Sequence, residues 1–452
     1  MKSETPRNLA LSVLNGLSHR PILSGSYLDD LSRRNAQLDE RDRAFISHLV
    51  QGVLRWRLRV DWIIEQTSDF PLEKIAPPIL NILRLALYQI FFLDRVPESA
   101  AVNEAVNQSK AHGAKHVVSF VNAILRRVCR NKAEITFPDP DSDPAYYLSV
   151  FYSYPLWLVK KWINDYGLDF TEALLAAGNR IPGFIIRTNI LRLGRHELIE
   201  RLEEEGMTAK PTPYSPQGII VEGLRGRPDG LSSFKDGLFQ VQDQAAQITS
   251  HLLAPQPGEN ILDICAGLGG KSTHLAELMG DRGRVLALDI SHRRLISLGR
   301  NSHRLGIACI TNLVADASSS LSSLFHFNFD KIMIDAPCSG FGVISRHPDG
   351  KWNRREVDID RLALLQKGML AEAASILRSA GKMLYVTCTI SKEENEEVVE
   401  DCLVRHGDVS LVNMKDHVPE WCLDLIDDMG FLRIFPHVHH MDGFFAALFT
   451  KK

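Results

Sequence analysis

The chain has 452 residues, of which 45% are hydrophobic and 24% are charged, and its formal net charge is −3 at pH 7. These values are typical of a soluble protein with two or three globular domains. The seven cysteines form no CxxC pair and no apolar stretch approaches 18 residues, which excludes a disulfide framework, a structural zinc site and a membrane span. The N-terminus carries no apolar core followed by a cleavage site, so we expect a cytoplasmic protein.

The charge is unevenly distributed along the chain. The first 60 residues contain nine arginines, and a second basic cluster covers 126–132. Such clusters are compatible with a local nucleic-acid surface, although a solvated arginine-rich helix face would produce the same pattern.

The N-terminal third of the chain has a helical pattern. Between about 5 and 132, apolar residues recur at helical spacing, and Pro71, Pro77, Pro78 and Pro97 fall between the runs as helix breakers. The stretch FPDPDSDP at 137–144 has three prolines and is typical of a linker. We therefore expect an all-α domain over 1–136.

A small α/β unit follows over 145–235. A helical pattern covers 145–180, a strand is expected at 183–187, a helix at 195–205 and a second strand at 218–221. The glycine-rich stretch 222–230 leads to the last region.

From 236 to 452, short β-branched runs alternate with helical segments. Strands are expected at 260–264, 284–289, 310–315, 331–334, 383–387 and 444–449. This alternation is the signature of a doubly wound parallel sheet, in which ligands bind at the carboxyl ends of the strands.

Three successive strand ends carry acids or glycines suited to a nucleoside. The first strand leads into a glycine-rich loop made of Cys265, Ala266, Gly267, Leu268, Gly269, Gly270 and Lys271. Glycines there let the backbone approach a ligand and expose amide donors at a helix N-terminus. Asp289 ends the next strand and can accept from ribose hydroxyls, and Asp316 follows the third strand, where it can reach an adenine amino group. The pattern predicts a nucleoside-containing cofactor.

The other two strand ends carry thiols, in Asp335-Ala-Pro-Cys338 and in Thr387-Cys388-Thr389. Free cysteines are usually only small apolar residues. Methylation of cytosine at carbon 5 would use two cysteines. A thiolate that adds at carbon 6 activates carbon 5 to attack an electrophilic methyl group, and the resulting adduct must afterwards be released. An acid such as Asp335 can hydrogen-bond the ring nitrogen as charge develops.

Taken together, these motifs resemble the RNA cytosine-C5 methyltransferases that use S-adenosylmethionine, and within them the bacterial small-subunit rRNA methyltransferase B group (RsmB, Sun or Fmu). The resemblance covers nearly the whole chain. It rests on LDICAGLGGKSTH, LALDIS, VADA, IDAPCSGFGVISRHPDGKW, YVTCTISKEENEEVV and MDGFFAALF in the last region, and on ERDRAFISHLVQGVLRWR, NILRLALYQIFFLDRVP and SFVNAILRR in the first.

The resemblance implies a multidomain fold. It implies a NusB-like RNA-binding domain over 1–136, a small α/β linker domain over 145–235 and a Rossmann-like class I methyltransferase domain over 236–452. It also implies a monomeric cytoplasmic enzyme that methylates carbon 5 of cytosine 967 in 16S rRNA, either free or in early small-subunit particles, without a metal. A tRNA substrate, or a non-catalytic NusB-like RNA-binding factor, are the alternatives.

The resemblance also assigns roles. Cys388 attacks, Cys338 assists release, and Asp335 holds the base; the 265–271 loop, Asp289, Asp316 and Asp335 contact the cofactor. By the same resemblance, Arg346 and Lys351 contact substrate. The chain departs from the family in two places, where Gly267-Leu268 replaces Ala-Pro and where Ser345 replaces an arginine.

Overall fold

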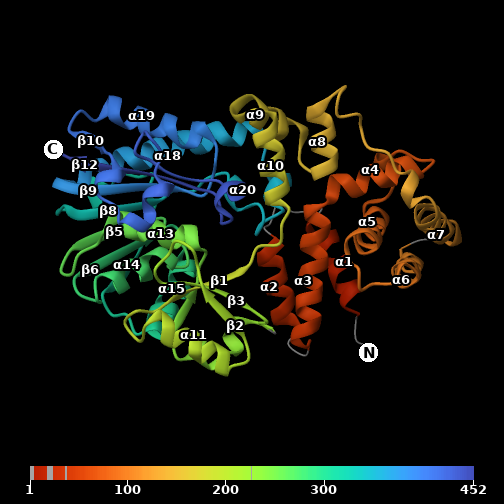
Figure 1. Cartoon of the computed structure of the whole chain (residues 1–452), viewed down its shortest axis with the longest axis horizontal. Helices are drawn as coiled ribbons and strands as arrows, with labels where there is room; N and C mark the ends of the chain where they lie inside the picture. Colours follow the sequence, from red (N-terminus) through yellow and green to blue (C-terminus); the bar gives the residue numbers. More distant parts are fainter. Residues whose placement is uncertain (1–4, 18–23, 36–37, 113, 225) are drawn as a thin grey trace. The chain divides into compact units, whose positions relative to one another are not determined.

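The computed structural model describes residues 5–17, 24–35, 38–112, 114–224 and 226–452. The chain forms two compact units. The first, called the helical unit here, comprises residues up to Arg180 together with Ile344–Arg354, and the second, the sheet unit, comprises Ile181–Val343 and Arg355–Lys452. Figure 1 follows the chain from its red N-terminal helices to its blue C-terminal strands.

The helical unit contains ten long helices among its described residues, and their ends follow from local sequence. Asp39 caps α3 by accepting from the amide of Asp42, and Pro77 occupies the first turn of α5, where a missing amide proton costs nothing. The helices are α1 (Pro6–Leu17), α2 (Ser24–Arg34), α3 (Glu40–Arg55), α4 (Arg57–Thr67), α5 (Pro77–Phe92), α6 (Glu98–Lys110), α7 (Lys115–Arg130), α8 (Pro144–Tyr152), α9 (Leu156–Tyr166) and α10 (Leu168–Gly178), with short 3-10 turns at Leu72–Lys74 and Lys132–Glu134.

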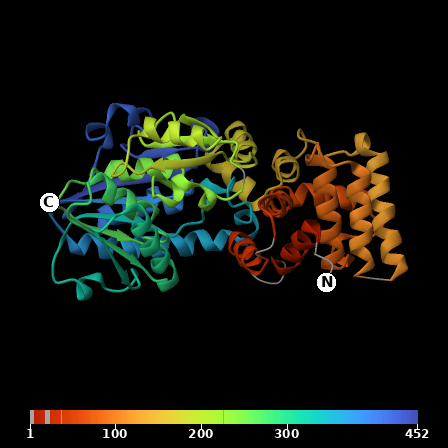
Figure 2. The ribbon, with the colours of Figure 1, turned by 90° about the horizontal axis from the view of Figure 1, so that it is seen from below.

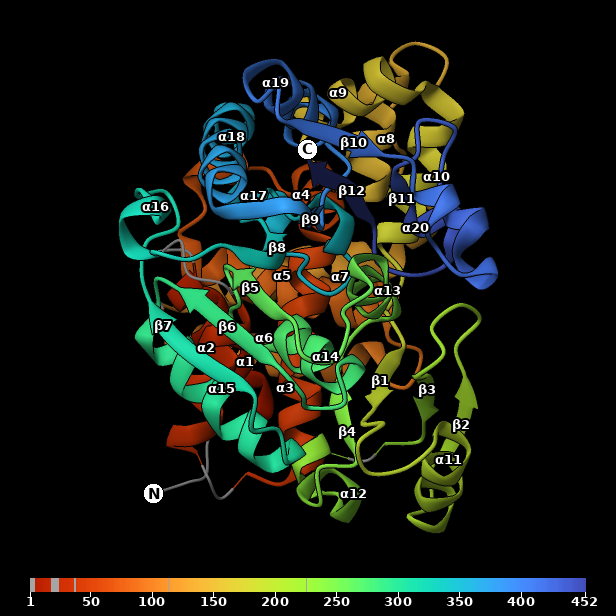
Figure 3. The ribbon, with the colours of Figure 1, turned by 90° about the vertical axis from the view of Figure 1, so that its left-hand side faces the viewer.

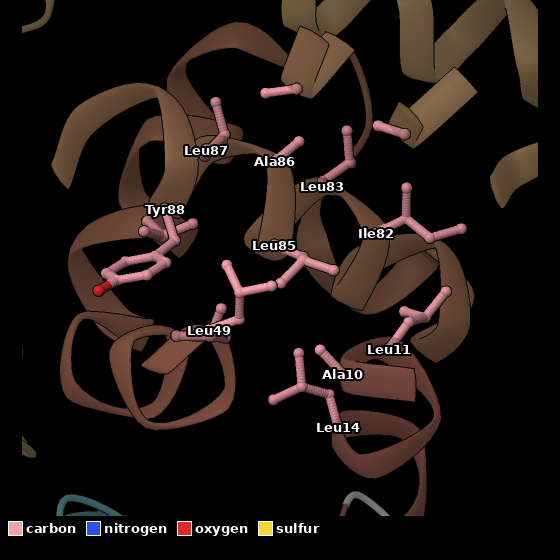
Figure 4. Packing of buried hydrophobic residues seen from close by; sticks show 14 of the residues in the cluster. Ala10, Leu11, Leu14, Leu49, Ile82, Leu83, Leu85, Ala86, Leu87 and Tyr88 are labelled. Atoms are coloured by element: carbon pink, nitrogen blue, oxygen red, sulfur yellow. The ribbon is translucent and has the colours of Figure 1, made fainter. Parts of the chain in front are cut away.

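The core of this unit is built around α5. Nearly every residue of α5 from Ile79 to Ile90 is buried, as expected for a helix surrounded by others. Figure 2 shows the orange helices α5 to α7 running side by side. In Figure 4 the side chains of Leu14, Leu49 and Leu85 meet from α1, α3 and α5. The expected all-α N-terminal region is thus confirmed.

A four-stranded antiparallel sheet opens the sheet unit. Its strands are β1 (Phe184–Thr188), β2 (Thr208–Pro211), β3 (Gly218–Glu222) and β4 (Phe239–Val241), in the order β2-β3-β1-β4, with helices α11 (Arg195–Glu204) and α12 (Ser232–Lys235). The strands expected near 183 and 218 and the helix near 195 are confirmed. Strand β4 pairs with β1, so this small sheet extends past residue 235.

The large sheet has the order β10-β12-β9-β8-β5-β6-β7, and β11 pairs with β12. Strands β5 to β9 are parallel, and β10, β11 and β12 pair in antiparallel fashion. All six expected strands are present. They are β5 (Asn260–Ile264), β6 (Arg284–Asp289), β7 (Ile310–Val314), β8 (Phe329–Asp335), β9 (Leu377–Thr387) and β12 (Phe444–Lys451), to which β10 (Val409–Val412) and β11 (Leu432–Ile434) are added.

Helices cover both faces of this sheet, because its strand residues alternate between two apolar clusters. Ile332 and Ile334 of β8 pack with α18 and α19, whereas Met333 packs with α13 and α14. Figure 3 shows these two helix pairs on opposite sides of the sheet. The helices are α13 (Gln244–Leu253), α14 (Gly270–Leu278), α15 (His292–Leu305), α16 (Leu321–Leu324), α18 (Glu356–Ile376), α19 (Glu396–Arg405) and α20 (Pro436–His439), with short 3-10 turns at Pro228–Gly230, Phe341–Val343, Lys392–Glu394, Met414–Asp416 and Glu420–Leu425.

Within the described parts of the chain, no helix is both long and apolar enough to cross a membrane.

Candidate active site

The predicted site residues meet at one edge of the large sheet. Because β5 to β9 are parallel, their carboxyl ends face the same way, and the register aligns Ile264 with Ile334, Asp289 with Val314 and Asp335 with Val386. The loops that follow these strands therefore converge. Four of the strand-end acids, at 263, 289, 316 and 335, act electrostatically on the single thiol of Cys265 and, with burial as the main cause, raise its pKa to about 12.

The loop after β5 has an unusual backbone. Cys265, Gly267 and Gly269 all have positive φ, at 65°, 58° and 82°. Cys265 is not a glycine, so this conformation stores strain of about 1 kcal/mol or more, as is common at functional sites. A Cβ on Gly269 would lie 2.4 Å from the Leu298 side chain, which makes glycine necessary there. Gly267 stands where the family has alanine, and its positive φ favours glycine.

Asp263 lies beneath this loop and is fully buried. Its Oδ2 accepts from the Ser272 hydroxyl at 2.5 Å, and its Oδ1 has no hydrogen-bond partner among the described residues. Burial raises the pKa of Asp263 to about 7, although the Ser272 hydrogen bond opposes the shift. An unpartnered buried oxygen at a strand end is a feature that a bound ligand or water can satisfy.

The two predicted nucleoside acids differ in environment. Asp289 is buried and accepts from the amides of Gly267 and Ser291 at 2.9 and 2.7 Å, so it fixes the loop that it faces. Asp316 is exposed, and its Oδ1 accepts from the amide and the hydroxyl of Ser318, which lowers its pKa. Both side chains are at the expected edge of the sheet.

Lys271 and Asp335 form an ion pair at 2.7 Å, and Lys271 Nζ also lies 5.3 Å from the centre of the Phe444 ring. Burial would lower the pKa of Lys271, but Asp335 and, more weakly, the Cys388 sulfur raise it overall. An ammonium group is therefore held close to both Asp335 and Cys388.

The two thiols lie side by side. Cys338 Sγ is 3.3 Å from Cys388 Sγ, although fifty positions separate the two cysteines in the sequence. The hydrogen bond to Cys388, together with burial and the carboxylate of Glu394, raises the pKa of Cys338 well above its usual value. The raised pKa favours the protonated thiol form of Cys338, and by geometry either sulfur can be the donor of this pair.

A polar cluster that sequence reasoning missed joins the two thiol loops. Glu394 Oε1 accepts from the amide of Ser339 at 2.8 Å and from Gln366 Nε2 at 3.1 Å, and Glu394 Oε2 accepts from the Ser339 hydroxyl at 2.5 Å. The Ser339 hydroxyl also lies 2.7 Å from that of Thr389. In the sequence, Glu394 is only one acid of a charged run, and nothing local marks it.

Arg187 is a second missed residue. It lies on β1 and is fully buried, and it donates to both Glu277 oxygens, to Gly270 O, to Thr273 Oγ1 and to Gln242 Oε1. All five guanidinium donors are thus used. Since Gly270 begins α14, Arg187 fixes the helix that follows the loop of 265–271.

The predicted substrate contact by Lys351 is wrong. Within the helical unit its side chain is 0% exposed, and Nζ donates to Arg55 O, Ser153 O and Asn179 Oδ1 at 3.1, 3.1 and 2.6 Å. Arg55 is the last residue of α3, and Ser153 and Asn179 are the C-caps of α8 and α10. Lys351 therefore donates to the carbonyls at the ends of α3 and α8 and to the side chain that caps α10, and it has no donor left for RNA. Arg346 is half-buried, and its role remains a prediction.

No group of three or more His, Cys, Asp or Glu side chains suited to a metal occurs in the described residues. The sequence FPHVHH at 435–440 carries three histidines, of which His439 Nδ1 accepts from the Phe435 amide at 3.0 Å.

Comparison with known proteins decides the family. Residues 250–450 match the profile described as 16S rRNA methyltransferase RsmB/F, residues 4–130 match the NusB family, and residues 154–225 match a RsmF/B-like ferredoxin-like domain. A probable ribosomal RNA small subunit methyltransferase B from Bacillus subtilis is 33% identical over 100% of both chains. The chain belongs to the RsmB/F family of rRNA methyltransferases.

Other RsmB/F relatives agree with this assignment. A probable ribosomal RNA small subunit methyltransferase B from Synechocystis is 36% identical over 98% of this chain and 99% of the relative. The Escherichia coli ribosomal RNA small subunit methyltransferase B is 32% identical over 92% of each. Among solved structures, PH0851 has a TM-score of 0.81 with 27% identity over 99% of both chains. A methyltransferase homologue from Pyrococcus horikoshii has a TM-score of 0.59 with 26% identity, over 69% of this chain and 99% of that one.

The RsmB/F assignment identifies the parts of the fold. Helices α1 to α7 lie in the NusB match, the four-stranded sheet belongs to a ferredoxin-like domain, and the mixed sheet is the methyltransferase core. Membership makes the chain an rRNA methyltransferase and implies S-adenosylmethionine as the methyl donor. The domain boundaries at 136, 145 and 235 remain predictions.

Proposed function

We propose that this RsmB/F enzyme methylates carbon 5 of cytosine 967 in 16S rRNA through a covalent bond between Cys388 and carbon 6 of the base. The observation that carries the proposal is the pair of thiols 3.3 Å apart, beside the Lys271–Asp335 ion pair and at the ends of parallel strands. The small-subunit rRNA substrate is supported by the names of relatives aligned over nearly the whole chain. The target nucleotide comes from the family resemblance alone.

The residues of the strand edge fit S-adenosylmethionine. The glycine-rich loop with its left-handed residues, the orphaned Oδ1 of Asp263 and the acids at 289 and 316 supply the backbone donors and carboxylates that its polar groups need. Leu268, Ile290 and Val314 are 62, 69 and 50% exposed at the same strand ends and offer apolar surface to an adenine ring. When bound, the cofactor supplies an electrophilic methyl group.

Cys388 is proposed as the nucleophile because the charges around the two thiols differ. Lys271 carries a positive charge near the Cys388 sulfur, whereas the Glu394 carboxylate faces Cys338. A cation favours the thiolate and an anion favours the thiol. The hydrogen bond from the Cys338 thiol further stabilises a Cys388 thiolate, which then adds at carbon 6.

Asp335 holds and protonates the base. As the Cys388 sulfur bonds to carbon 6, negative charge develops on the ring at N3, and Asp335 passes a proton to N3 while it takes one from Lys271 Nζ, 2.7 Å away. Carbon 5 then has enamine character and attacks the methyl group. The Lys271–Asp335 pair thus serves as a proton reservoir for the ring nitrogen.

Release reverses these steps. The proton on carbon 5 leaves to a water molecule, its electron pair forms the C5=C6 double bond, and the C6–S bond breaks with its electrons returning to the Cys388 sulfur. The Cys338 thiol donates a hydrogen bond to that departing sulfur, and the N3 proton returns to Asp335 and Lys271. Cys338 therefore acts in release and not in attack.

The test is a pair of cysteine variants assayed with 16S rRNA fragments and labelled S-adenosylmethionine. We expect Cys388→Ala to abolish methyl transfer and Cys338→Ala to leave an SDS-stable protein–RNA adduct. An adduct that forms only in the Cys388 variant would reverse the two roles. Bisulfite sequencing of rRNA and tRNA, with and without the protein, identifies the nucleotide, and modification confined to tRNA would refute the rRNA assignment.

A further inference from the structure

The carboxylate of Glu394 joins the segments that carry the two thiols. Glu394 is fully buried, and its carboxylate accepts hydrogen bonds from the amide and the hydroxyl of Ser339, the residue next to Cys338 in the chain. Through the Ser339 hydroxyl it is linked to Thr389, next to Cys388. Gln366 of α18 donates from Nε2 both to Glu394 Oε1 and to Pro337 O, at 3.1 and 2.9 Å, and so fixes the Cys338 loop from a third element.

The direction of each hydrogen bond in this cluster follows from its donors. The Ser391 amide donates to Thr389 Oγ1 at 3.3 Å, so the Thr389 hydroxyl is free to donate to Ser339 Oγ. The Ser339 hydroxyl then donates to Glu394 Oε2. With the Ser339 amide and Gln366, Glu394 accepts three hydrogen bonds, which favour its ionised form.

The charges near the two thiols differ, and the Glu394 carboxylate is the negative charge near Cys338. The groups that act on the pKa of Cys338 are the Cys388 sulfur and the Glu394 carboxylate. The Tyr385 hydroxyl donates to Glu394 O at 2.6 Å. The cation of the site, Lys271, pairs instead with Asp335 and lies near Cys388. A negative charge therefore faces one thiol and a positive charge faces the other.

We propose that Glu394 is a positioning residue for the release step, because it fixes the Cys338 loop and keeps the Cys338 thiol protonated and directed at the Cys388 sulfur. This inference rests on the proposed function of the two thiols. Glu394 touches neither the base nor the cofactor in this scheme. It acts when the C6–S bond breaks, since the electrons that return to Cys388 are then stabilised by a hydrogen bond from a thiol that Glu394 holds in place.

Two substitutions separate the geometry from the charge. In Glu394→Gln, the amide oxygen can accept from the Ser339 amide and Gln366, and the amide NH₂ can donate to the Ser339 hydroxyl, so the links remain and the charge is lost. In Glu394→Ala both are lost. Ser339→Ala removes the link to Thr389 and one bond to Glu394. Glu397→Gln, an exposed acid three residues further along, is the matched control.

The assay separates attack from release. Each variant is mixed with S-adenosylmethionine and an rRNA fragment, and a single turnover of methyl transfer, steady-state turnover and the SDS-stable adduct are measured. We expect Glu394→Ala to lower steady-state turnover about tenfold or more, with single-turnover methyl transfer changed less than about threefold and with accumulated adduct approaching that of Cys338→Ala. Ser339→Ala should lie between Glu394→Ala and the wild type.

The charge is tested by pH. In the wild type, release slows as pH rises through the pKa of Cys338, because the donor proton is lost. Without the Glu394 carboxylate that pKa falls, so Glu394→Gln should release normally near neutral pH and lose its release rate at a lower pH than the wild type. Glu397→Gln should match the wild type throughout.

Several results would overturn the inference. Equal losses of methyl transfer, adduct and turnover in Glu394→Ala would mean that Glu394 only supports the fold, and an unchanged pH profile in Glu394→Gln would remove its charge from the mechanism. Should Glu394→Ala fail to fold, Ser339→Ala and Glu394→Gln decide the question. If Cys338→Ala itself traps no adduct, the proposed function fails first, and the role of Glu394 falls with it.

Discussion

Lys351→Met tests whether one buried lysine holds the C-terminal ends of three helices of the helical unit together. Lys351 Nζ donates to Arg55 O, Ser153 O and Asn179 Oδ1, and it lies 3.6 Å from the centre of the Tyr154 ring. Burial lowers the pKa of this lysine, and the charge of Arg55 lowers it further.

The expected loss is large because the acceptors remain buried after the substitution. A buried acceptor that loses its donor costs about 1–3 kcal/mol, so three of them cost roughly 3–9 kcal/mol. Methionine has a similar length and removes the desolvation cost of the ammonium, which is several kcal/mol. The difference leaves a net destabilisation of about 3–5 kcal/mol, in the range measured when one partner of a buried charged network is removed.

Hydrogen exchange is the appropriate measurement, because a chain with two compact units does not unfold in a single two-state transition. Amides in the last turns of α3, α8 and α10 should exchange about 100-fold faster or more in Lys351→Met, whereas those of the large sheet should not change. Lys160→Met, an exposed lysine of α9, is the control. Exchange in Lys351→Met within about threefold of that control would refute the reasoning.

Three further predictions concern the sheet unit. Arg187→Met should lower the free energy of opening of the sheet unit, measured by hydrogen exchange, by about 3–5 kcal/mol, because it leaves Glu277 unpaired, and the double variant with Glu277→Leu should recover most of that loss. Calorimetry on the double variant should still show weaker S-adenosylmethionine binding, because Gly270 O has lost its donor. His274 is fully buried without a ring hydrogen bond to any described residue, and burial with the Arg187 charge lowers its pKa well below 6.5, so the unfolded state binds the proton first. Stability should therefore fall as pH drops below 6.5, and His274→Phe should reduce that fall in acid unfolding. If stability depends on pH equally steeply in His274→Phe and the wild type, His274 is not the group responsible. Gly342→Ala should reduce methyl transfer from tritium-labelled S-adenosylmethionine at least tenfold, because its Cβ would lie 2.0 Å from Gly443 O and 2.9 Å from Cys388 O. Near-normal activity would show that the backbone at these two residues can shift to make room.

The elements that could be predicted from the sequence are those with long apolar runs. The six expected strands of the large sheet were readable because residues such as Ile332, Met333 and Ile334 are buried on both faces of a parallel sheet. Strands β2 and β4 were missed, since TAKP and FQV are too short to show a period of two. They exist because they pair with β3 and β1, which is a tertiary cause.

The candidate site likewise has residues that the local sequence reveals and residues that only tertiary contacts reveal. Acids at the ends of parallel strands could be located from the sequence, because strand order and direction bring Asp289 and Asp335 to one edge. Contacts such as Arg187 with Glu277 join positions 90 residues apart and leave no local pattern. Lys351 was misread for the opposite reason, because a lysine within a family motif suggests RNA, whereas helix ends distant in sequence determine its surroundings.

The assignment of the two thiols need not depend on resemblance alone. Fifty residues apart in sequence, Cys338 and Cys388 look equivalent, and either could attack a base. Their surroundings differ, because Lys271 lies near one sulfur and Glu394 near the other. This difference supports the proposed roles, with Cys388 as the nucleophile and Cys338 as its helper, and removing both charges with Glu394→Gln and Lys271→Met should weaken the distinction between the two thiols.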